Sequence, residues 1–121
     1  MTKTVLIMLL LHHLADYTLQ GWLANGKQKS WWDEAFGGTT PAKYRNDYKC
    51  ALLCHSLYWA LVVFVPIWWG AAPDTALPML CTNTIVHYAV DDLKANERVI
   101  NLWTDQVLHW LQILVTAAVC L

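Results

Sequence analysis

Histidine and aspartate side chains recur four residues apart in three stretches of this chain. The three pairs are His12 with Asp16, His87 with Asp91, and Asp105 with His109. Residues four apart on an α-helix lie one above the other on the same face, so each pair presents an imidazole and a carboxylate together. A fourth apolar stretch contributes a single histidine, His55.

These residue types are typical of a metal site. Zn²⁺ takes neutral imidazole nitrogens and carboxylate oxygens, and helical bundles build such sites from paired ligands on facing helices. We therefore predict a divalent metal cofactor, Zn²⁺ in the first place and Mn or Fe as the alternatives. The predicted ligands are His12, Asp16, His55, His87, Asp91, Asp105 and His109.

The predicted set is larger than one tetrahedral ion requires. Either two ions bind, or some members orient the ligands and one carboxylate acts as a general base. The candidates for this catalytic role are Asp16, Asp91 and Asp105. Two neighbours are excluded from the set: His13 points about 100° away from His12 on a helix, and Asp92 is expected at a solvated helix end.

Four apolar segments must position these side chains, namely residues 4–23, 50–73, 76–93 and 102–121. Residues 50–73 contain no charge and reach the length of about 20 residues that a bilayer-spanning helix needs. The other three contain His and Asp, and an ionised Asp at the centre of a span costs about 2.5–3.5 kcal/mol. A bound cation would offset that cost.

The order of the polar residues predicts that they meet at one depth. The first segment reaches its pair late, the second meets His55 early, the third reaches its pair late, and the fourth begins with its pair. In an up-and-down bundle, all four contributions then lie near the same end. The sequence predicts an all-α fold with four transmembrane helices, in a single domain of residues 1–121.

Composition favours a membrane protein. The chain is 57% hydrophobic and 14% charged, against about 25% charged in ordinary soluble domains, and it contains eight Trp. A net charge of −1 gives no support for a nucleic-acid partner. The partners we expect are membrane lipids, together with a second copy of the chain or another membrane protein. A water-soluble bundle is the alternative.

Basic residues predict the orientation. Lys and Arg gather in loops 21–49 and 94–101, whereas the termini and residues 70–75 together hold only Lys3. Because basic loops normally stay in the cytoplasm, we expect a bacterial inner-membrane protein with both termini on the opposite side. The insert at residues 24–49 is long for a compact bundle, and its WWDEAF stretch could lie at the headgroup level or form a plain loop.

The cysteines carry no predicted chemistry. They form no CxxC pair, so neither a zinc knuckle nor a redox dithiol is indicated. We expect them to be small buried hydrophobic residues, because free cysteine usually packs in that way. The four are Cys50, Cys54, Cys81 and Cys120.

Taken with their order, the motifs HHLADYTLQ, VHYAVDDLK and DQVLHWLQILVT resemble the domain-of-unknown-function family numbered 3307. This family consists of small multi-helix membrane proteins of bacteria and their phages, and the resemblance covers nearly the whole chain. The family's pattern is similar to that of membrane-bound metal-dependent hydrolases, a step that rests on analogy. By position, its recurring polar residues fall on His12, Asp16, Gln20, His55, His87, Asp91, Asp105, Gln106 and His109.

These observations lead to a functional hypothesis. We expect a membrane-embedded, metal-dependent hydrolase that cleaves a phosphoester or similar bond in a lipid or amphiphile. Two alternatives use the same residues. In the first, the His and Asp pairs form a metal-free polar network that braces a structural or partner-binding protein. In the second, they form an ion or proton pathway.

Overall fold

A computed structural model describes residues 1–68 and 72–121, and in these ranges the chain is helical with no β-strand. The predicted all-α class is confirmed. The helices are α1 (Thr2–His13), α2 (Leu23–Gly26), α3 (Lys29–Ala35), α4 (Asp47–Phe64), α5 (Pro73–Ala95) and α6 (Leu102–Cys120). Three short turns accompany them: the π-helical η1 (Leu14–Thr18) and the 3₁₀ turns η2 (Ala42–Tyr44) and η3 (Val65–Ile67).

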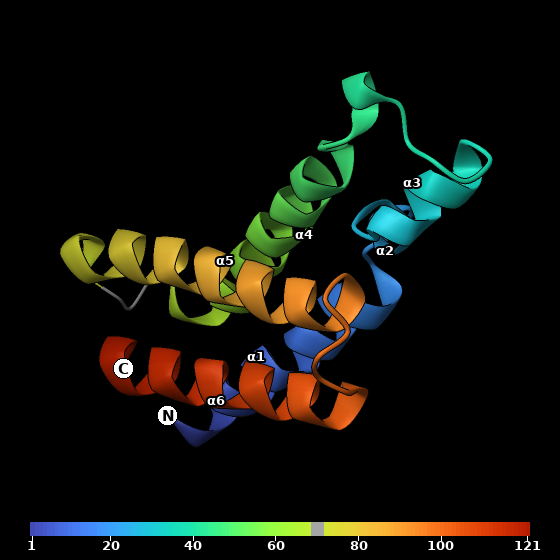
Figure 1. Cartoon of the computed structure of the whole chain (residues 1–121). Helices are drawn as coiled ribbons and strands as arrows, with labels where there is room; N and C mark the ends of the chain where they lie inside the picture. Colours follow the sequence, from blue (N-terminus) through green and yellow to red (C-terminus); the bar gives the residue numbers. More distant parts are fainter. Residues whose placement is uncertain (69–71) are drawn as a thin grey trace.

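The four long helices form a closed bundle. Helix α1 packs against α4 and α6, and α5 packs against the same two helices from the other side. Figure 1 shows α5 and α6 lying side by side in opposite directions, with both chain termini at the left end of the bundle. Helices α2 and α3 extend from the opposite end, where α2 packs against α4.

The interior of the bundle is divided along its length. Toward the termini it is mainly apolar, and its largest fully buried side chains are Trp59, Phe64 and Met8. The buried pair of Asn83 and Thr116, hydrogen-bonded at 2.9 Å, is an exception there. Toward the other end it is polar and contains buried histidines and aspartates from all four long helices. The predicted convergence at one depth follows from this arrangement, because each helix supplies apolar residues to one half and polar residues to the other.

The outward faces of the helices are apolar. Leu6 on α1, Leu77 on α5 and Trp103 on α6 are 61%, 61% and 75% exposed. Many other Leu, Ile and Val residues along the four long helices are also exposed. Large exposed apolar surfaces are typical of membrane or protein interaction sites.

The prediction that the cysteines are buried was wrong. Cys50, Cys54 and Cys81 are exposed, and Cys120 is half-buried. The physical reason is the position of the cysteines on the helices: Cys50, Cys54 and Cys81 lie on outward faces, which are apolar in this bundle, so an apolar residue there need not be buried.

By length and apolarity, one helical stretch in the described chain could cross a membrane. It is Ala42–Ile67, with a mean hydropathy of 2.0 over its most apolar part. The other long helices contain the buried His and Asp residues, which lower their mean hydropathy.

The predicted long connection is folded. The indole of Trp32 donates to the carbonyl of Gly26 at 2.8 Å. Gly26 lies under Trp22, since a Cβ built at position 26 would stand 2.0 Å from that indole ring. Asp33 accepts hydrogen bonds from the hydroxyl and the amide of Thr40, which lower the pKa of its carboxyl group. The connection is thus an ordered unit at one end of the bundle.

Candidate metal centre

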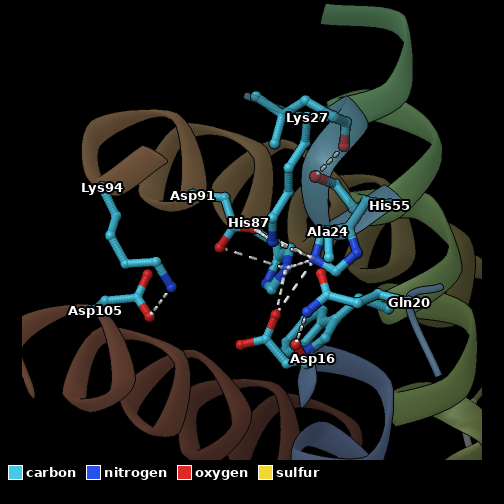
Figure 2. A network of polar contacts seen from close by, with 12 residues as sticks. Asp16, Gln20, Ala24, Lys27, His55, His87, Asp91, Lys94 and Asp105 are labelled. Carbon is cyan, nitrogen blue, oxygen red and sulfur yellow. Dashed lines mark hydrogen bonds and ion pairs between the residues drawn. The ribbon is translucent and has the colours of Figure 1, made fainter. Parts of the chain in front are cut away.

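Four buried side chains from three elements converge at the polar end of the bundle. Asp16 comes from η1, His55 from α4, and His87 with Asp91 from α5. One ligand atom from each lies within 4.8 Å of the others, so the group could hold a metal ion. Figure 2 shows these side chains pointing toward one another between the helices.

The separations of these atoms match those of ligands around a small cation. His55 Nε2 lies 3.2 Å from His87 Nε2, 3.3 Å from Asp16 Oδ1 and 3.2 Å from Asp91 Oδ2. His87 Nε2 lies 4.0 Å from Asp16 Oδ1 and 3.7 Å from Asp91 Oδ1. With bonds of about 2.0–2.1 Å, two ligands of a tetrahedral Zn²⁺ lie about 3.3–3.4 Å apart. A small shift of the side chains would therefore suffice for an ion.

A second group adjoins the first and shares a residue with it. Asp16, Asp105 and His109 also bring one ligand atom each within 4.8 Å of the others. His109 Nε2 lies 3.4 Å from Asp105 Oδ1 and 3.2 Å from Asp91 Oδ1. Of the seven predicted ligands, six therefore belong to one or both groups.

His12 is the seventh, and its two ring nitrogens have other partners. The indole N–H of Trp59 donates to His12 Nδ1 at 2.9 Å. A neutral His12 then carries its proton on Nε2, and we infer that it donates this proton to Gln106 Oε1 at 3.0 Å. The structure therefore places His12 beside the ligand groups, where it orients Gln106.

Gln106 in turn hydrogen-bonds to two carboxylates and fixes their orientation. Because its oxygen accepts from His12, its amide N–H groups face the cluster. They donate to Asp105 Oδ2 at 2.9 Å and to Asp16 Oδ2 at 3.4 Å. Outer partners of this kind fix ligand orientation in metal sites. The sequence pattern had included Gln106 without defining this role.

Two lysines complete the cluster, and the sequence analysis missed both. The buried ammonium of Lys27 donates to Asp91 Oδ2 at 2.6 Å and to His55 Nε2 at 3.2 Å. Lys94 donates to Asp105 Oδ2 at 2.8 Å. Figure 2 shows Lys27 reaching the cluster from the connection between α1 and α4. Lys94 could have been found, since it follows Asp91 by three residues on a helix; Lys27 lies in a predicted loop.

Each of the three carboxylates has one anchored oxygen and one directed at imidazoles. The anchored oxygens are those that accept from lysine or Gln106. Asp16 Oδ1 and Asp105 Oδ1 are buried and accept no hydrogen bond from any described residue. A buried carboxylate oxygen normally has a partner, and a bound cation would provide one.

Charge also favours a cation. With neutral imidazoles, the three buried carboxylates face two ammonium groups, those of Lys27 and Lys94, and one negative charge is left over. An isolated charge in a low-dielectric interior is strongly unfavourable. A bound divalent cation would offset this negative charge and leave one positive charge in the cluster.

The backbone departs from the α-helix at Asp16. Residues Leu14–Thr18 form a π-helical turn, closed by the hydrogen bond from the Leu19 amide to the Leu14 carbonyl at 2.8 Å. Such turns occur frequently at functional sites. The side chain of Gln20 donates to the carbonyl of Asp16 in the next turn. The i,i+4 spacing alone could not predict this local change.

The two residues that the sequence analysis excluded as ligands, His13 and Asp92, lie outside both ligand groups. His13 is exposed. Asp92 is half-buried near the end of α5 and accepts a hydrogen bond from Asn96 at 2.7 Å. Both agree with their exclusion from the predicted ligand set.

Comparisons with known proteins gave no match to a family model, to a curated protein or to a solved structure. The resemblance to the domain-of-unknown-function family stays a prediction.

Proposed function

We propose that this protein is a membrane-embedded, metal-dependent hydrolase that cleaves a phosphoester or similar bond in a lipid or amphiphile. The observation that carries the proposal is the buried group of Asp16, His55, His87 and Asp91, whose ligand atoms lie within 4.8 Å of one another. A divalent ion supplies Lewis-acid activation of water and stabilises charge on a phosphoryl oxygen. Zn²⁺ suits this mixture of imidazole and carboxylate best, with Mn²⁺ and Fe²⁺ as alternatives.

A carboxylate of the chain would accept the proton of the attacking water. In phosphoester hydrolysis, a water oxygen bonds to phosphorus, the bond to the leaving oxygen breaks, and the water's proton goes to a base. The carboxylates within reach are Asp16, Asp91 and Asp105, and each has an oxygen directed into the cluster. The ammonium groups of Lys27 and Lys94 lie close enough to offset negative charge on the substrate.

The apolar surface beside the cluster supports an amphiphilic substrate. Two neighbouring cavities of about 340 and 270 Å³ lie between α1 and α6, and they share His13 and Trp110. Gln106, which hydrogen-bonds two carboxylates of the cluster, lines the larger cavity. An alkyl chain in this α1–α6 groove would hold its polar end near Gln106. The groove-lining residues are Leu9, His13, Tyr17, Leu102, Trp103, Gln106, Trp110 and Leu114.

The exposed apolar faces support a membrane location. We propose that α1 with η1, α4, α5 and α6 all lie within the bilayer, with their polar residues buried against one another rather than facing lipid. Insertion into the bacterial inner membrane, with residues 21–49 and 94–101 in the cytoplasm, would follow the basic residues of these loops.

Hydrolysis of p-nitrophenyl phosphodiesters in detergent micelles tests this function. We expect release of p-nitrophenol that requires added Zn²⁺ or Mn²⁺, stops with chelator, and is lost in His87→Ala. An ester with a long alkyl chain should have a higher kcat/KM than its methyl analogue, and Leu114→Trp should reduce that difference by narrowing the groove. Release that is unaffected by chelator and by His87→Ala would refute the proposal.

A metal-free bracing network is the second candidate, and the lysines favour it. Lys27 pairs with Asp91 and Lys94 with Asp105, and such contacts can hold the helices together by themselves. This alternative predicts no bound metal, and it predicts that Asp16→Asn keeps the fold, because an amide can still hydrogen-bond. Metal content therefore separates the two candidates.

A further inference from the structure

The second ligand group has features that the first group does not explain. Asp105 is fully buried, its Oδ2 is held by Lys94 and Gln106, and its Oδ1 accepts no hydrogen bond from the described residues. This unpaired oxygen faces His109 Nε2 at 3.4 Å. An ion bound only by Asp16, His55, His87 and Asp91 would leave that oxygen without a partner, whereas His109 Nε2 also hydrogen-bonds to Asp91 Oδ1 at 3.2 Å.

Two carboxylates connect the groups. Asp16 belongs to both, and its Oδ1 is buried without a hydrogen-bond donor from the described chain. Asp91 Oδ1 lies 3.7 Å from His87 Nε2 and 3.2 Å from His109 Nε2, between the imidazoles of the two groups. In two-metal hydrolytic sites the ions lie about 3.5–4 Å apart, a separation that a shared carboxylate can bridge.

We propose that the cluster is a two-metal site in which Asp16 bridges the ions, an inference that rests on the proposed function. Asp16, His55, His87 and Asp91 bind the first ion, and Asp16, Asp105 and His109 bind the second. Four protein ligands fill a tetrahedral shell, whereas three leave a position open for water or substrate, as in catalytic zinc sites.

The second ion would lie nearer the substrate than the first. Asp105 accepts a hydrogen bond from Gln106, and Gln106 lines the cavity of about 340 Å³ between α1 and α6. The second ion therefore lies on the side of the cluster toward the α1–α6 groove, whereas the first lies toward α4 and Lys27. The substrate class that suits this arrangement is a phosphoester, whose two non-bridging oxygens can contact both ions.

Reconstitution with Mn²⁺ tests the proposal. Wild type, His109→Ala and Asp105→Asn are loaded with excess Mn²⁺, passed through a desalting column, and analysed for metal per chain and by electron paramagnetic resonance. We expect two ions per chain and an exchange-coupled spectrum for wild type, and one uncoupled ion for each variant. Gln112→Leu, which alters the separate contacts to Asn83, is the control and should keep two coupled ions.

The outcomes separate this proposal from the proposed function. One ion in wild type, retained in His109→Ala, would overturn the two-metal site and leave a one-metal hydrolase. Two ions that remain in both His109→Ala and Asp105→Asn would place the second ion elsewhere and overturn the assignment. No bound ion in wild type would overturn both proposals.

Discussion

Lys27 supplies a buried positive charge where a metal ion would also act. Its ammonium lies 2.6 Å from Asp91 Oδ2, and only 6% of the residue is exposed. Removing one partner of a buried ion pair leaves an uncompensated charge, which destabilises a protein by about 3–5 kcal/mol. At the residue scale, Lys27 and the metal therefore stabilise the same carboxylate.

Lys27→Met should accordingly lower the stability of the metal-free protein by about 3–5 kcal/mol. Added Zn²⁺ should raise the Tm of this variant more than that of wild type, because the ion replaces the missing cation at Asp91. Thermal unfolding in detergent with and without metal measures both effects. Lys29→Met is the matched control, since Lys29 is exposed and forms no ion pair within the described residues. Equal Tm increases on addition of Zn²⁺ in wild type, Lys27→Met and Lys29→Met would contradict the claim that Lys27 and the metal stabilise the same carboxylate.

Gln106 gives a second prediction at this scale. Gln106→Leu removes the donor to Asp16 and Asp105 and leaves the His12 N–H without its acceptor. Loss of such an outer partner typically reduces metal affinity by about 10–100-fold. Zn²⁺ titration in competition with a chelating dye measures the change. Gln28→Leu is the control, because Gln28 donates only to the carbonyl of Ala24 in its own turn; the same loss there would argue against the orienting role.

The connection between α1 and α4 acts as one element because Asn96 holds it to the bundle. The Asn96 side chain donates to the carbonyl of Lys27 at 3.1 Å and accepts from the amide of Lys29 at 2.8 Å. These two contacts fix the backbone on both sides of Gln28. They thereby keep the Lys27 side chain directed into the cluster.

Asn96→Ala should therefore loosen this connection while the four-helix bundle stays folded. We expect faster amide hydrogen exchange in residues 23–36 and little change in α5 and α6, measured by mass spectrometry. Asn101→Ala is the matched control: Asn101 caps α6 by accepting from the Thr104 amide, so only the start of α6 should exchange faster. Unchanged exchange in residues 23–36 of Asn96→Ala would show that Asn96 does not hold the connection to the bundle.

At this scale, the sequence predicted the helices better than their internal details. The i,i+4 pairs lay in apolar segments long enough for helices, so the helix face and the common depth of the ligands could be read from spacing. The π-helical turn at Asp16 could not, because it depends on tertiary packing. The role of His12 could not either, because its partners Trp59 and Gln106 come from two other helices. Lys27 lies 64 residues from Asp91 in sequence, and no local pattern connects them.

The whole molecule is apolar outside and polar in half of its interior, an arrangement that suits a bilayer. Ile85 on α5 and Val99 in the following connection are both 67% exposed. In water, the two positions would tolerate a charge equally. In the proposed membrane orientation, Ile85 faces lipid and Val99 lies in the aqueous phase.

Ile85→Arg should thus impair membrane insertion, since an arginine at the centre of a span costs about 2.5–3.5 kcal/mol. Val99→Arg should have no such effect. The fraction of each protein retained in membranes after alkaline carbonate washing measures the difference. Equal retention of both variants, or release of the wild-type protein by the wash, would contradict the membrane location.

Elemental analysis of purified protein tests the central claim of a metal centre most directly. Wild type and His13→Ala, the exposed neighbour of His12, should contain at least one Zn, Mn or Fe per chain. His87→Ala, which removes a buried imidazole of the first ligand group, should contain little. Wild-type protein that is purified without chelator, contains no metal and takes none up on addition would contradict the account.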